Sequence, residues 1–491
     1  MFYPDFPAFC QLLNSGNLIP VYREIMADMD TPVTAFKKID DGHFSFLLES
    51  IEGGEKWARY SFLGSNPSII IRSRGETVEI IENGTLSRQR TPDPLGAIRA
   101  LLARFTPVEV EGLPRFFGGA VGYFGYDMVR HFEHLPTGKP AVLDAWDSYF
   151  LVTDTIIIFD TMRQKIKVVS NAHLDGSQTP EAAYAEATGK INAIIARLRT
   201  SLAFQPVPGT RAAINFRSNI SRETFETAVE RAKEYVRAGD VIQVVLSQRF
   251  SGELTADPLD IYRVLRTLNP SPYMFFLRLD DTVIAGASPE VMVRKEASNV
   301  ELRPIAGTRP RGATPEDDLR LADELLADPK ERAEHVMLVD LGRNDLGRVC
   351  KTGSVKVSEL MVIERYSHVM HIVSNVQGQL ENRYDAFDLV RATFPAGTLS
   401  GAPKVRAMQI IDELEPVRRE IYGGSVGYFS FSGNMDLAIA IRTLVIKDGT
   451  VYLQAGAGIV ADSDPAAEWQ ETVNKGMAVM KAIELAEKGL D

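Results

Sequence analysis

The chain has 491 residues, of which 45% are apolar and 24% are charged, as in ordinary globular proteins. Its formal net charge of −11, without a lysine- or arginine-rich block, argues against nucleic-acid or anionic-membrane partners. Two cysteines, Cys10 and Cys350, are too few for a disulfide framework or a four-thiolate zinc site. The first residues lack the basic-then-apolar pattern of a secretory signal, and no apolar run approaches the ~18 residues of a membrane span. We therefore expect a cytoplasmic protein.

Strand patterns dominate the first part of the chain. Runs rich in β-branched and aromatic residues occur at 44–50, 68–71, 150–152 and 156–159. A helix pattern over 181–199 is followed by a segment, 204–210, whose prolines and glycine cannot continue a helix. We therefore predict an N-terminal domain of residues 1–200 and a second domain of residues 220–485.

The second part of the chain mixes strands and helices irregularly. Strand patterns occur at 241–250, 273–279, 300–305, 369–376, 425–431, 437–446 and 450–454. The last two are separated by Lys447-Asp448-Gly449, which is a hairpin signal. Because several strands follow one another without a helix between them, we predict an α+β fold with antiparallel sheets rather than a doubly wound parallel sheet.

Helix starts in this part carry clear capping signals. Ser221 is the predicted N-cap of a helix that ends at Gly239. Three further helices are predicted from an Asp-Pro pair, in which Asp caps the exposed N–H groups and Pro takes the first helical position. These pairs are Asp257-Pro258, Asp328-Pro329 and Asp464-Pro465.

Two Glu-x-x-Glu pairs occupy the first turns of the last two of these helices. The pairs are Glu331 with Glu334 and Glu468 with Glu471. A spacing of three places each pair on one helix face, and facing carboxylates suit Mg²⁺, which takes hard oxygen ligands. Glutamate is also favoured in first turns because it opposes the helix dipole, so spacing alone favours solvated helix faces over a metal site.

A glycine-rich segment follows the last predicted strand. Gly456-Ala457-Gly458, with the three residues after it, formally matches the dinucleotide-binding pattern G-x-G-x-x-A. In that fold a helix begins inside the motif, whereas here the next helix starts only at Pro465. We therefore reject dinucleotide binding and predict a loop that presents backbone N–H groups to a carboxylate.

Two further segments have features of anion-binding loops. Residues 394–404 are mostly small and lead into a helix predicted over 404–414, whose N-terminus would attract an anion. Residues 304–312 combine glycine with Arg309 and Arg311, and arginine binds carboxylates through two parallel hydrogen bonds. An ordinary capped loop and a solvated basic turn would look similar.

Taken together, these segments resemble the chorismate-utilising enzymes over about residues 220–480. The matching motifs are PIAGTR at 304–309, ERAEH at 331–335, LGRND at 341–345, FPAGTLSGAPK at 394–404, YGG at 422–424, AIRT at 440–443 and AGAGIV at 455–460. The resemblance implies an α+β fold in which antiparallel sheets and helices surround a central cleft. The first 165 or so residues resemble, through weaker motifs, the regulatory N-terminal domain of anthranilate synthase large subunits.

Two positions discriminate within that family. Isochorismate and salicylate synthases carry a water-activating lysine in the strand where this chain has Gln243, and glutamine cannot act as a base. Aminodeoxychorismate synthases typically carry a lysine nucleophile where this chain has Ala306. The remaining pattern is that of anthranilate synthase component I, a lyase that converts chorismate and ammonia to anthranilate and pyruvate in tryptophan biosynthesis.

The resemblance also implies a set of active-site residues. Magnesium is expected at Glu334 and Glu471, with Glu331 and Glu468 close by. Expected substrate-binding residues are Gly307, Thr308, Tyr422, Arg442, Gly456, Ala457, Gly458 and Lys475. Expected catalytic residues are Glu290 as the general acid for the departing hydroxyl, His371 for pyruvate elimination, Thr398 for positioning substrate, and Gln243.

The resemblance further implies a partner and an inhibitor. Neither cysteine lies in a nucleophile context, so ammonia is expected from a separate glutamine amidotransferase subunit, anthranilate synthase component II, in a heterotetramer. Feedback inhibition by tryptophan is expected at a site that includes Ser50, Pro272, Tyr273 and Met274. The alternatives are an aminodeoxychorismate synthase, a 2-amino-2-deoxyisochorismate synthase, and a non-catalytic amino-acid-sensing homologue.

Overall fold

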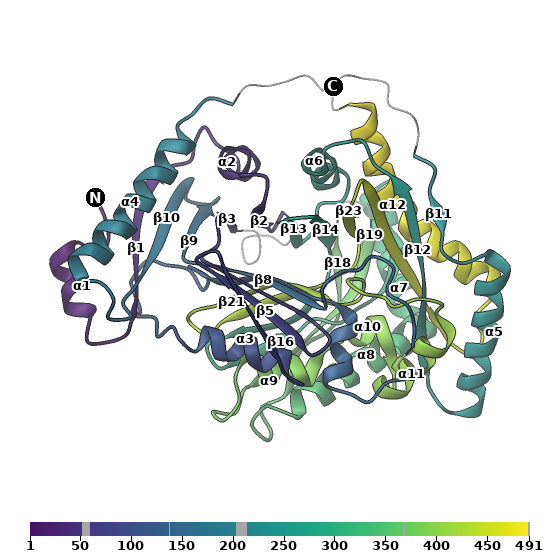
Figure 1. The fold of residues 1–491 in the computed structure, drawn as a ribbon. Coiled ribbons are helices and arrows are strands. Elements are labelled where there is room, and N and C mark those ends of the chain that lie inside the picture. The colour runs from purple at the N-terminus through teal and green to yellow at the C-terminus, as the bar shows by residue number, and fades with distance from the viewer. Residues whose placement is uncertain (52–58, 137, 203–213, 367–368, 490–491) are drawn as a thin grey trace.

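Two large antiparallel sheets form the centre of the molecule in a computed structural model (Figure 1). The structure describes residues 1–51, 59–136, 138–202, 214–366 and 369–489. Within these residues each sheet has 12 strands, and helices cover the outer faces. The predicted α+β class with antiparallel sheets is therefore confirmed. The segment 204–210, predicted to separate two domains, lies outside the described residues.

The first sheet combines strands from both parts of the chain. In spatial order it contains β1 (Leu18–Met26), β10 (Lys165–His173), β9 (Thr155–Asp160), β3 (Tyr60–Ser65), β2 (Phe44–Glu49), β13 (Tyr273–Leu279), β14 (Thr282–Ser288), β23 (Thr443–Lys447), β24 (Thr450–Ile459), β12 (Gln243–Glu253) and β11 (Arg217–Ser218). The short strand β20 (Gly401–Ala402) pairs with β12. The two parts of the chain meet where β2 pairs with β13.

The second sheet is assembled in the same way. In spatial order it contains β17 (Ile305–Pro310), β19 (Val369–Gln379), β16 (Asn299–Leu302), β15 (Val291–Glu296), β22 (Met435–Ile439), β21 (Ser425–Ser430), β7 (Gly119–Phe124), β8 (Ser148–Thr153), β4 (Ile69–Arg74), β5 (Thr77–Glu82) and β6 (Thr85–Arg90). An outer strand, β18 (Lys356–Arg365), pairs with β19. Here the two parts of the chain meet where β7 pairs with β21.

The helices form layers outside the sheets. Those against the outer face of the first sheet are α1 (Phe6–Leu12), α2 (Pro32–Ile39), α4 (Pro180–Leu198), α6 (Pro258–Leu268) and α12 (Pro465–Lys488). Those on the second sheet are α3 (Pro94–Leu102), α7 (Pro315–Ala327), α8 (Pro329–Gly347) and α9 (Ala386–Thr393). The remaining helices, near β12, are α5 (Arg222–Ala238), α10 (Gly397–Ser400) and α11 (Lys404–Leu414), and a 3-10 turn spans Tyr126–His131.

The largest hydrophobic core lies between the two sheets. Phe275 and Leu277 of β13 pack there with Val121 of β7 and Phe150 of β8, all of them buried. Full burial of one such side chain contributes roughly 1.5–3 kcal/mol. A second core lies between the first sheet and its outer helices, where Phe276 of β13 points to the opposite face from its neighbours. The first sheet is therefore apolar on both faces.

The predicted helix starts are confirmed. Asp257, Asp328 and Asp464 each accept a hydrogen bond from the first turn of the helix that they cap. Ser221 caps α5, which ends at Gly239 with a left-handed φ of 82°. Both Glu-x-x-Glu pairs therefore lie in the first two turns of their helices, with Glu331 and Glu468 in the first turn.

Two strand predictions and one loop prediction are wrong. The predicted strand 300–305 is divided between β16, which ends at Leu302, and β17, which begins at Ile305. The predicted single strand 437–446 is broken at 440–442, where the chain leaves β22 of the second sheet and enters β23 of the first. Arg442 lies at this crossing with a left-handed φ of 49°. The predicted loop at 456–458 is instead part of β24, because β12 pairs with it along its length. Its N–H groups therefore belong to a strand rather than to an open loop.

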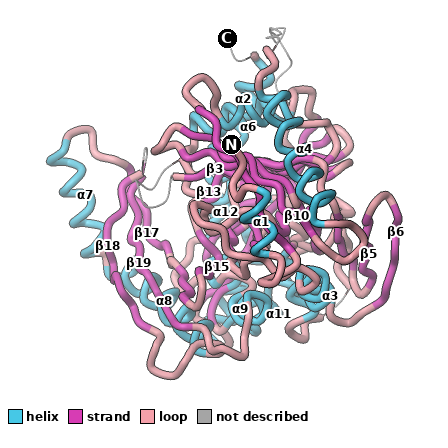
Figure 2. Tube along the Cα trace, turned by 90° about the vertical axis from the view of Figure 1, so that its left-hand side faces the viewer, coloured by secondary structure: helices cyan, strands magenta, loops and turns pink. Residues whose placement is uncertain are grey.

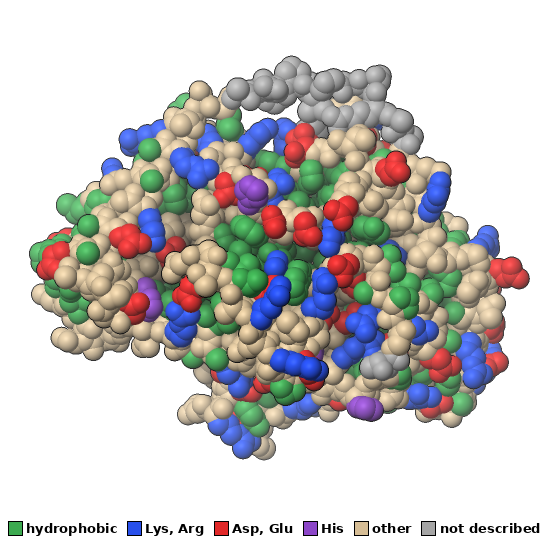
Figure 3. All heavy atoms as spheres, in the orientation of Figure 1, with side chains coloured by type: hydrophobic (Ala, Val, Ile, Leu, Met, Phe, Trp, Pro, Cys, Tyr) green, Lys and Arg blue, Asp and Glu red, His purple; other side chains and the backbone are tan. Residues whose placement is uncertain are grey.

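The outline of the molecule is uneven. Strands β17, β18 and β19 with α7 form a lobe on one side, and β5 and β6 lie on the other (Figure 2). On the face seen in Figure 3, hydrophobic side chains gather in a recess across the middle, bordered by basic and acidic side chains. Among the described residues, no helix is long and apolar enough to cross a membrane.

Candidate active site

Helices α8 and α12 bring the two Glu-x-x-Glu pairs to one region beside β12 and β24. Gln243 of β12 donates from Nε2 to Oε1 of Glu334 at 3.1 Å. Lys475 of α12 forms an ion pair with Glu471 at 2.7 Å and donates to the carbonyl oxygen of Gly456 at 2.9 Å. Burial raises the pKa of Glu468, and the neighbouring Glu471 raises it further. Two helices far apart in the sequence therefore share one acidic region.

The negative charge of the Glu331–Glu334 pair on α8 is partly neutralised by Arg309. Arg309 donates to Oε1 of Glu331 at 3.2 Å and to Oδ2 of Asp328 at 2.9 Å. Burial nevertheless raises the pKa of Glu331, and the charge of Glu334 adds to the rise while Arg309 opposes it. Of the two arginines predicted as possible carboxylate binders, Arg309 thus binds the protein's own acids, and Arg311 likewise pairs with Asp318 at 2.8 Å.

The four glutamates do not converge as a preformed metal cage. Within the described ranges, no group of three or more His, Cys, Asp or Glu side chains is close enough to hold a metal ion. The donor chemistry still fits a hard cation, because each helix presents two carboxylates in the same region. One carboxylate in each pair has a pKa raised by burial and by its neighbour, which is a repulsion that a cation would relieve.

Gly456 and Gly458 of β24 leave room for the side chains of Tyr422 and Gln243, which pack against this strand. A Cβ atom at Gly458 would lie 2.1 Å from Nε2 of Gln243. A Cβ atom at Gly456 would lie 2.8 Å from the hydroxyl oxygen of Tyr422. Ala457 between them is fully buried and points to the opposite face, as alternate residues of a strand do. Glycine is therefore required at 456 and 458 for Gln243 and Tyr422 to approach the backbone.

Glu290 lies in the turn between β14 and β15, and its carboxyl is buried. Burial raises the pKa of Glu290 to about 8, although Thr398, the Ile305 backbone and Arg442 each lower it in part. Oγ1 of Thr398 is close enough for this effect but makes no hydrogen bond of good geometry within the described residues. A carboxyl with this pKa is mostly protonated at neutral pH and can donate a proton.

Arg442 approaches Glu290 from the crossing between the two sheets. Burial lowers the pKa of its guanidinium, while Tyr366 and Glu290 raise it. Among the described residues, no side chain forms an ion pair with Arg442 within 4.0 Å. A largely buried arginine without a carboxylate partner is costly for the free protein and suits an anionic ligand.

His371 of β19 faces the bulge of β17. Its Nδ1 lies 3.0 Å from the carbonyl oxygen of Gly307 and 3.0 Å from Oγ1 of Thr308. A carbonyl only accepts, so we assign the proton to Nδ1, which leaves the lone pair on Nε2. Burial lowers the pKa of His371, so the ring is neutral at pH 7. Gly307 allows the bulge because its φ is 72°.

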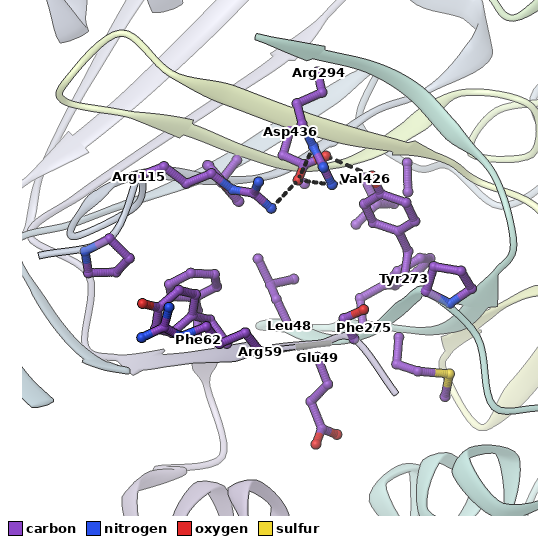
Figure 4. Close-up of a pocket in the computed structure, with 18 of the residues that line it drawn as sticks. Leu48, Glu49, Arg59, Phe62, Arg115, Tyr273, Phe275, Arg294, Val426 and Asp436 are labelled. Carbon is purple, nitrogen blue, oxygen red and sulfur yellow. Dashed lines mark hydrogen bonds and ion pairs between the residues drawn. The ribbon is translucent and has the colours of Figure 1, made fainter. Parts of the chain in front are cut away.

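A separate cavity of about 510 Å³ lies between the two sheets, lined from β2, β3, β13, β15, β21 and β22 (Figure 4). All four residues predicted to bind tryptophan, Ser50, Pro272, Tyr273 and Met274, line it. They come together because Met274 pairs with Glu49 across β2 and β13. The cavity is lined by apolar and aromatic side chains together with arginines, and it lies apart from the carboxylate pairs.

Polar groups in this cavity are arranged asymmetrically. Asp436 accepts from Arg294, Arg115 and the Tyr273 hydroxyl, the last at 3.0 Å. The Glu49 side chain points away from the cavity in Figure 4 and accepts from the Tyr262 hydroxyl of α6 at 2.6 Å. The cavity therefore presents more positive than negative charge, which suits a carboxylate-bearing ligand with an apolar body.

Some residues of the site were not predicted from the sequence. Arg419 and Glu415 form a buried pair beneath Tyr422, with Nη2 of Arg419 2.6 Å from Oε1 of Glu415. Their Glu-x-x-x-Arg spacing was the only available signal, and it falls beyond the end of the helix predicted over 404–414. Tyr366, whose ring contacts that of His371 at 5.6 Å, gave no signal because it lies outside the recognised motifs.

The sequence and the fold were compared with known proteins. The family model described as "chorismate binding enzyme" matches residues 47–481. Anthranilate synthase component 1 of Aquifex aeolicus is 53% identical over 481 residues, which are 97% of each chain. The protein of the same name from Acetivibrio thermocellus is 49% identical over 492 residues, 99% of each chain.

The similar solved structures agree. Anthranilate synthase component I from Streptococcus pneumoniae superposes with a TM-score of 0.76 at 39% identity, covering 93% of this chain and 99% of that one. The menaquinone-specific isochorismate synthase of Escherichia coli superposes with a TM-score of 0.72 at 18% identity, covering 97% of this chain and 99% of that one. At that identity the second likeness shows the fold alone.

The chain belongs to the chorismate-binding enzyme family. Its relatives of about 50% identity over nearly their whole length carry the name anthranilate synthase component 1. The resemblance to that enzyme, drawn from the motifs, is therefore confirmed, and so is the prediction of an enzyme of this class.

Proposed function

We propose that this chain is the large subunit of an anthranilate synthase that converts chorismate and ammonia to anthranilate and pyruvate in tryptophan biosynthesis. The observation that carries the proposal is Glu290, a buried carboxyl with a pKa of about 8 that lies near Arg442, whose guanidinium forms no ion pair with a carboxylate in the part of the chain that the structure describes. This arrangement provides a proton donor and a carboxylate binder in one place.

The first step uses the protonated form of Glu290. Ammonia adds to the ring carbon beside the one that bears the carboxylate, and the ring hydroxyl departs. Glu290 gives its proton to that hydroxyl, which leaves as water, and the added ammonium group loses a proton in turn. At pH 7 a carboxyl with a pKa of about 8 is mostly in the form that this step requires.

The second step eliminates pyruvate and makes the ring aromatic. His371 is neutral at pH 7, and its Nδ1 is held by Gly307 and Thr308. Its Nε2 lone pair can therefore accept a proton from the ring without a change of tautomer. Thr308 and Gly307 thus orient the base, and Thr398 positions the substrate beside Glu290.

The substrate carboxylates are bound by groups from both sheets. Arg442 and Lys475 supply positive charge, and Tyr422 supplies a hydroxyl above Gly456. The backbone of residues 456–458 contributes to substrate binding from near the end of β24, and not from an open loop. Magnesium, held by Glu334 and Glu471 with Glu331 and Glu468 nearby, would supply further positive charge for the ring carboxylate.

Ammonia comes from a glutamine amidotransferase subunit in a hetero-oligomer, since the name "component 1" that the relatives carry implies a second component. A glutaminase needs a reactive thiolate with a histidine base. Burial raises the pKa of Cys350 to about 11, and Cys10 lies in α1 far along the chain from the site residues. Neither thiol suits that reaction, which supports a separate glutaminase.

Tryptophan inhibits the enzyme from the cavity between the sheets. The volume of about 510 Å³ suits a ligand of this size, and Phe62, Tyr273 and Phe275 offer surfaces for an indole ring. Arg59 and Arg115 line this cavity and are the candidates to bind its carboxylate, although each also pairs with an aspartate of the protein (Figure 4).

A single assay tests the proposed reaction. The purified chain is incubated with chorismate, magnesium chloride and an ammonium salt, and anthranilate fluorescence and pyruvate are measured together. Equal amounts of both products are expected. An amino product without pyruvate would indicate a synthase that stops at the aminodeoxy stage, and no turnover would overturn the proposal.

A further inference from the structure

The buried side chain of Arg419 joins segments that line the candidate active site. It is 3% exposed and lies between α11 and β21, outside any helix. Its Nη1 donates to the carbonyl oxygen of Leu399 at 2.6 Å, and Leu399 is the residue after Thr398. Its guanidinium carbon lies 5.6 Å from the centre of the Tyr422 ring. One cation therefore contacts both the Thr398 segment and Tyr422.

The same guanidinium also holds β12. Nη2 of Arg419 donates to the carbonyl oxygen of Val245 at 2.7 Å, two residues after Gln243. Gln243 in turn donates to Glu334 at 3.1 Å. The arginine is thus bonded directly to β12, the strand whose Gln243 contacts the carboxylate pair on α8.

Glu415 fixes the orientation of this guanidinium. Nε of Arg419 donates to Oε2 of Glu415 at 2.9 Å, and Nη2 donates to Oε1 at 2.6 Å. Oε1 of Glu415 also accepts from the backbone N–H and the hydroxyl of Ser247 on β12, at 2.9 and 2.7 Å. Four of the five N–H donors of Arg419 are therefore taken up by protein acceptors, and the side chain is buried, so we assign it no direct contact with the substrate.

We propose that Arg419, oriented by Glu415, is a positioning residue that holds Thr398, Tyr422 and the start of β12 in the arrangement that binds chorismate. The inference rests on the proposed function, because Thr398 and Tyr422 are its assigned substrate contacts. Arg419 acts through these residues and touches none of the reacting atoms. Its planar fork is required because it reaches Leu399, Val245 and Glu415 in three directions at once.

A second buried arginine, Arg249, serves as a control that distinguishes a positioning role of Arg419 from a general effect on stability. Arg249 of β12 is 4% exposed and forms an ion pair with Glu420 at 3.1 Å. It also donates to Gln454 at 3.1 Å and to the carbonyl oxygen of Arg418, and within the described residues none of its hydrogen bonds reaches Thr398, Tyr422 or Gln243. Arg249 thus braces the two residues on either side of Arg419, and Gln454 and Ser247 join it indirectly to Glu415, but it does not replace the bonds of Arg419 to Leu399 and Val245. Loss of a buried guanidinium fork at either position should destabilise the fold to a similar degree.

The experiment compares Arg419→Lys with Arg249→Lys in the full chain, with ammonium as the nitrogen source. Thermal unfolding, kcat and the KM for chorismate are measured for both. We expect both variants to lose a few degrees of Tm. We expect only Arg419→Lys to raise the KM for chorismate, by about tenfold or more, because a small misplacement of binding groups is costly. The KM of Arg249→Lys should stay within about twofold of the parent value.

Equal KM values for the two variants would overturn the inference. If Arg419→Lys does not fold, Glu415→Gln is measured instead, since it keeps the arginine but removes the charge that orients it. A raised KM is expected there too, and an unchanged KM would refute the inference. A parent chain that shows no turnover but binds chorismate in calorimetry would refute the proposed function while leaving Kd as the readout for Arg419. A parent chain that does not bind chorismate would overturn both.

Discussion

The backbone N–H of Ile439 donates a hydrogen bond of 3.0 Å to the carbonyl oxygen of Glu290. Ile439 follows Ala438, which lines the cavity between the sheets and pairs with Val291. On the other side, Tyr273 of the same cavity pairs with Ser288, two residues before Glu290. Of the strands that line the cavity, β22 thus ends and β13 begins next to the segment that carries Glu290. A ligand in the cavity is therefore linked to the candidate general acid through a short chain of contacts.

Filling this cavity should remove inhibition without removing activity. In Ser50→Phe the aromatic ring occupies space that tryptophan needs, while Glu290 and Arg442 are untouched. The parent chain should gain a few degrees of Tm at 100 times Kd of tryptophan, which corresponds to about 2.7 kcal/mol of linkage. The variant should gain none and should keep activity within about twofold at any tryptophan concentration. Full inhibition of the variant would contradict this placement of the inhibitor.

The pKa of Glu290 predicts the direction of the pH dependence. The general acid must be protonated, and its pKa is about 8, so kcat/KM for chorismate, measured at a constant concentration of free ammonia, should fall as the pH rises above 8. The fall should approach about tenfold for each pH unit. In Glu290→Gln, kcat should be lower by roughly 10²- to 10⁴-fold. The decrease of kcat/KM at alkaline pH should also be absent, because glutamine does not ionise. A parent profile flat to pH 10 would rule out this role.

The carboxylate pairs predict a magnesium dependence. Glu334→Gln and Glu471→Gln should each abolish magnesium-dependent turnover while leaving Tm within a few degrees of the parent value. Binding of magnesium in calorimetry should be lost in parallel. Glu484→Gln provides a matched control, because Glu484 is an exposed glutamate on the same helix as Glu471. Full activity in both test variants would show that these residues are ordinary solvated helix faces.

The tautomer assigned to His371 predicts a role for Thr308. Thr308→Val removes one of the two oxygens within 3.0 Å of Nδ1, while the Gly307 carbonyl still holds the proton there. We expect kcat to fall by only about tenfold or less. His371→Gln should lower kcat by about 10²-fold or more, since no base remains. Release of an aminodeoxy product in place of anthranilate would assign His371 to the second step, and unchanged kcat would exclude that role.

Local signals predicted the helix ends well. The caps at Asp257, Asp328, Asp464 and Ser221 are formed as expected, because capping depends on residues within one turn. Strand limits were less predictable where the chain changes sheets. The residues around Arg442 carry no glycine or proline, so the apolar run 437–446 read as one strand although its halves belong to different sheets.

The sequence by itself determined the residue types of the site, their order in the chain and the family that this order identifies. Only the tertiary structure decided which of these groups are paired and in which protonation state they lie. In the folded chain Arg309 pairs with Glu331, whereas Arg442 has no carboxylate partner among the described residues. Burial of Glu290 raises its pKa to about 8. The reason is physical: desolvation and charge pairing depend on neighbours brought together from distant segments, whereas capping and helix-face spacing are local.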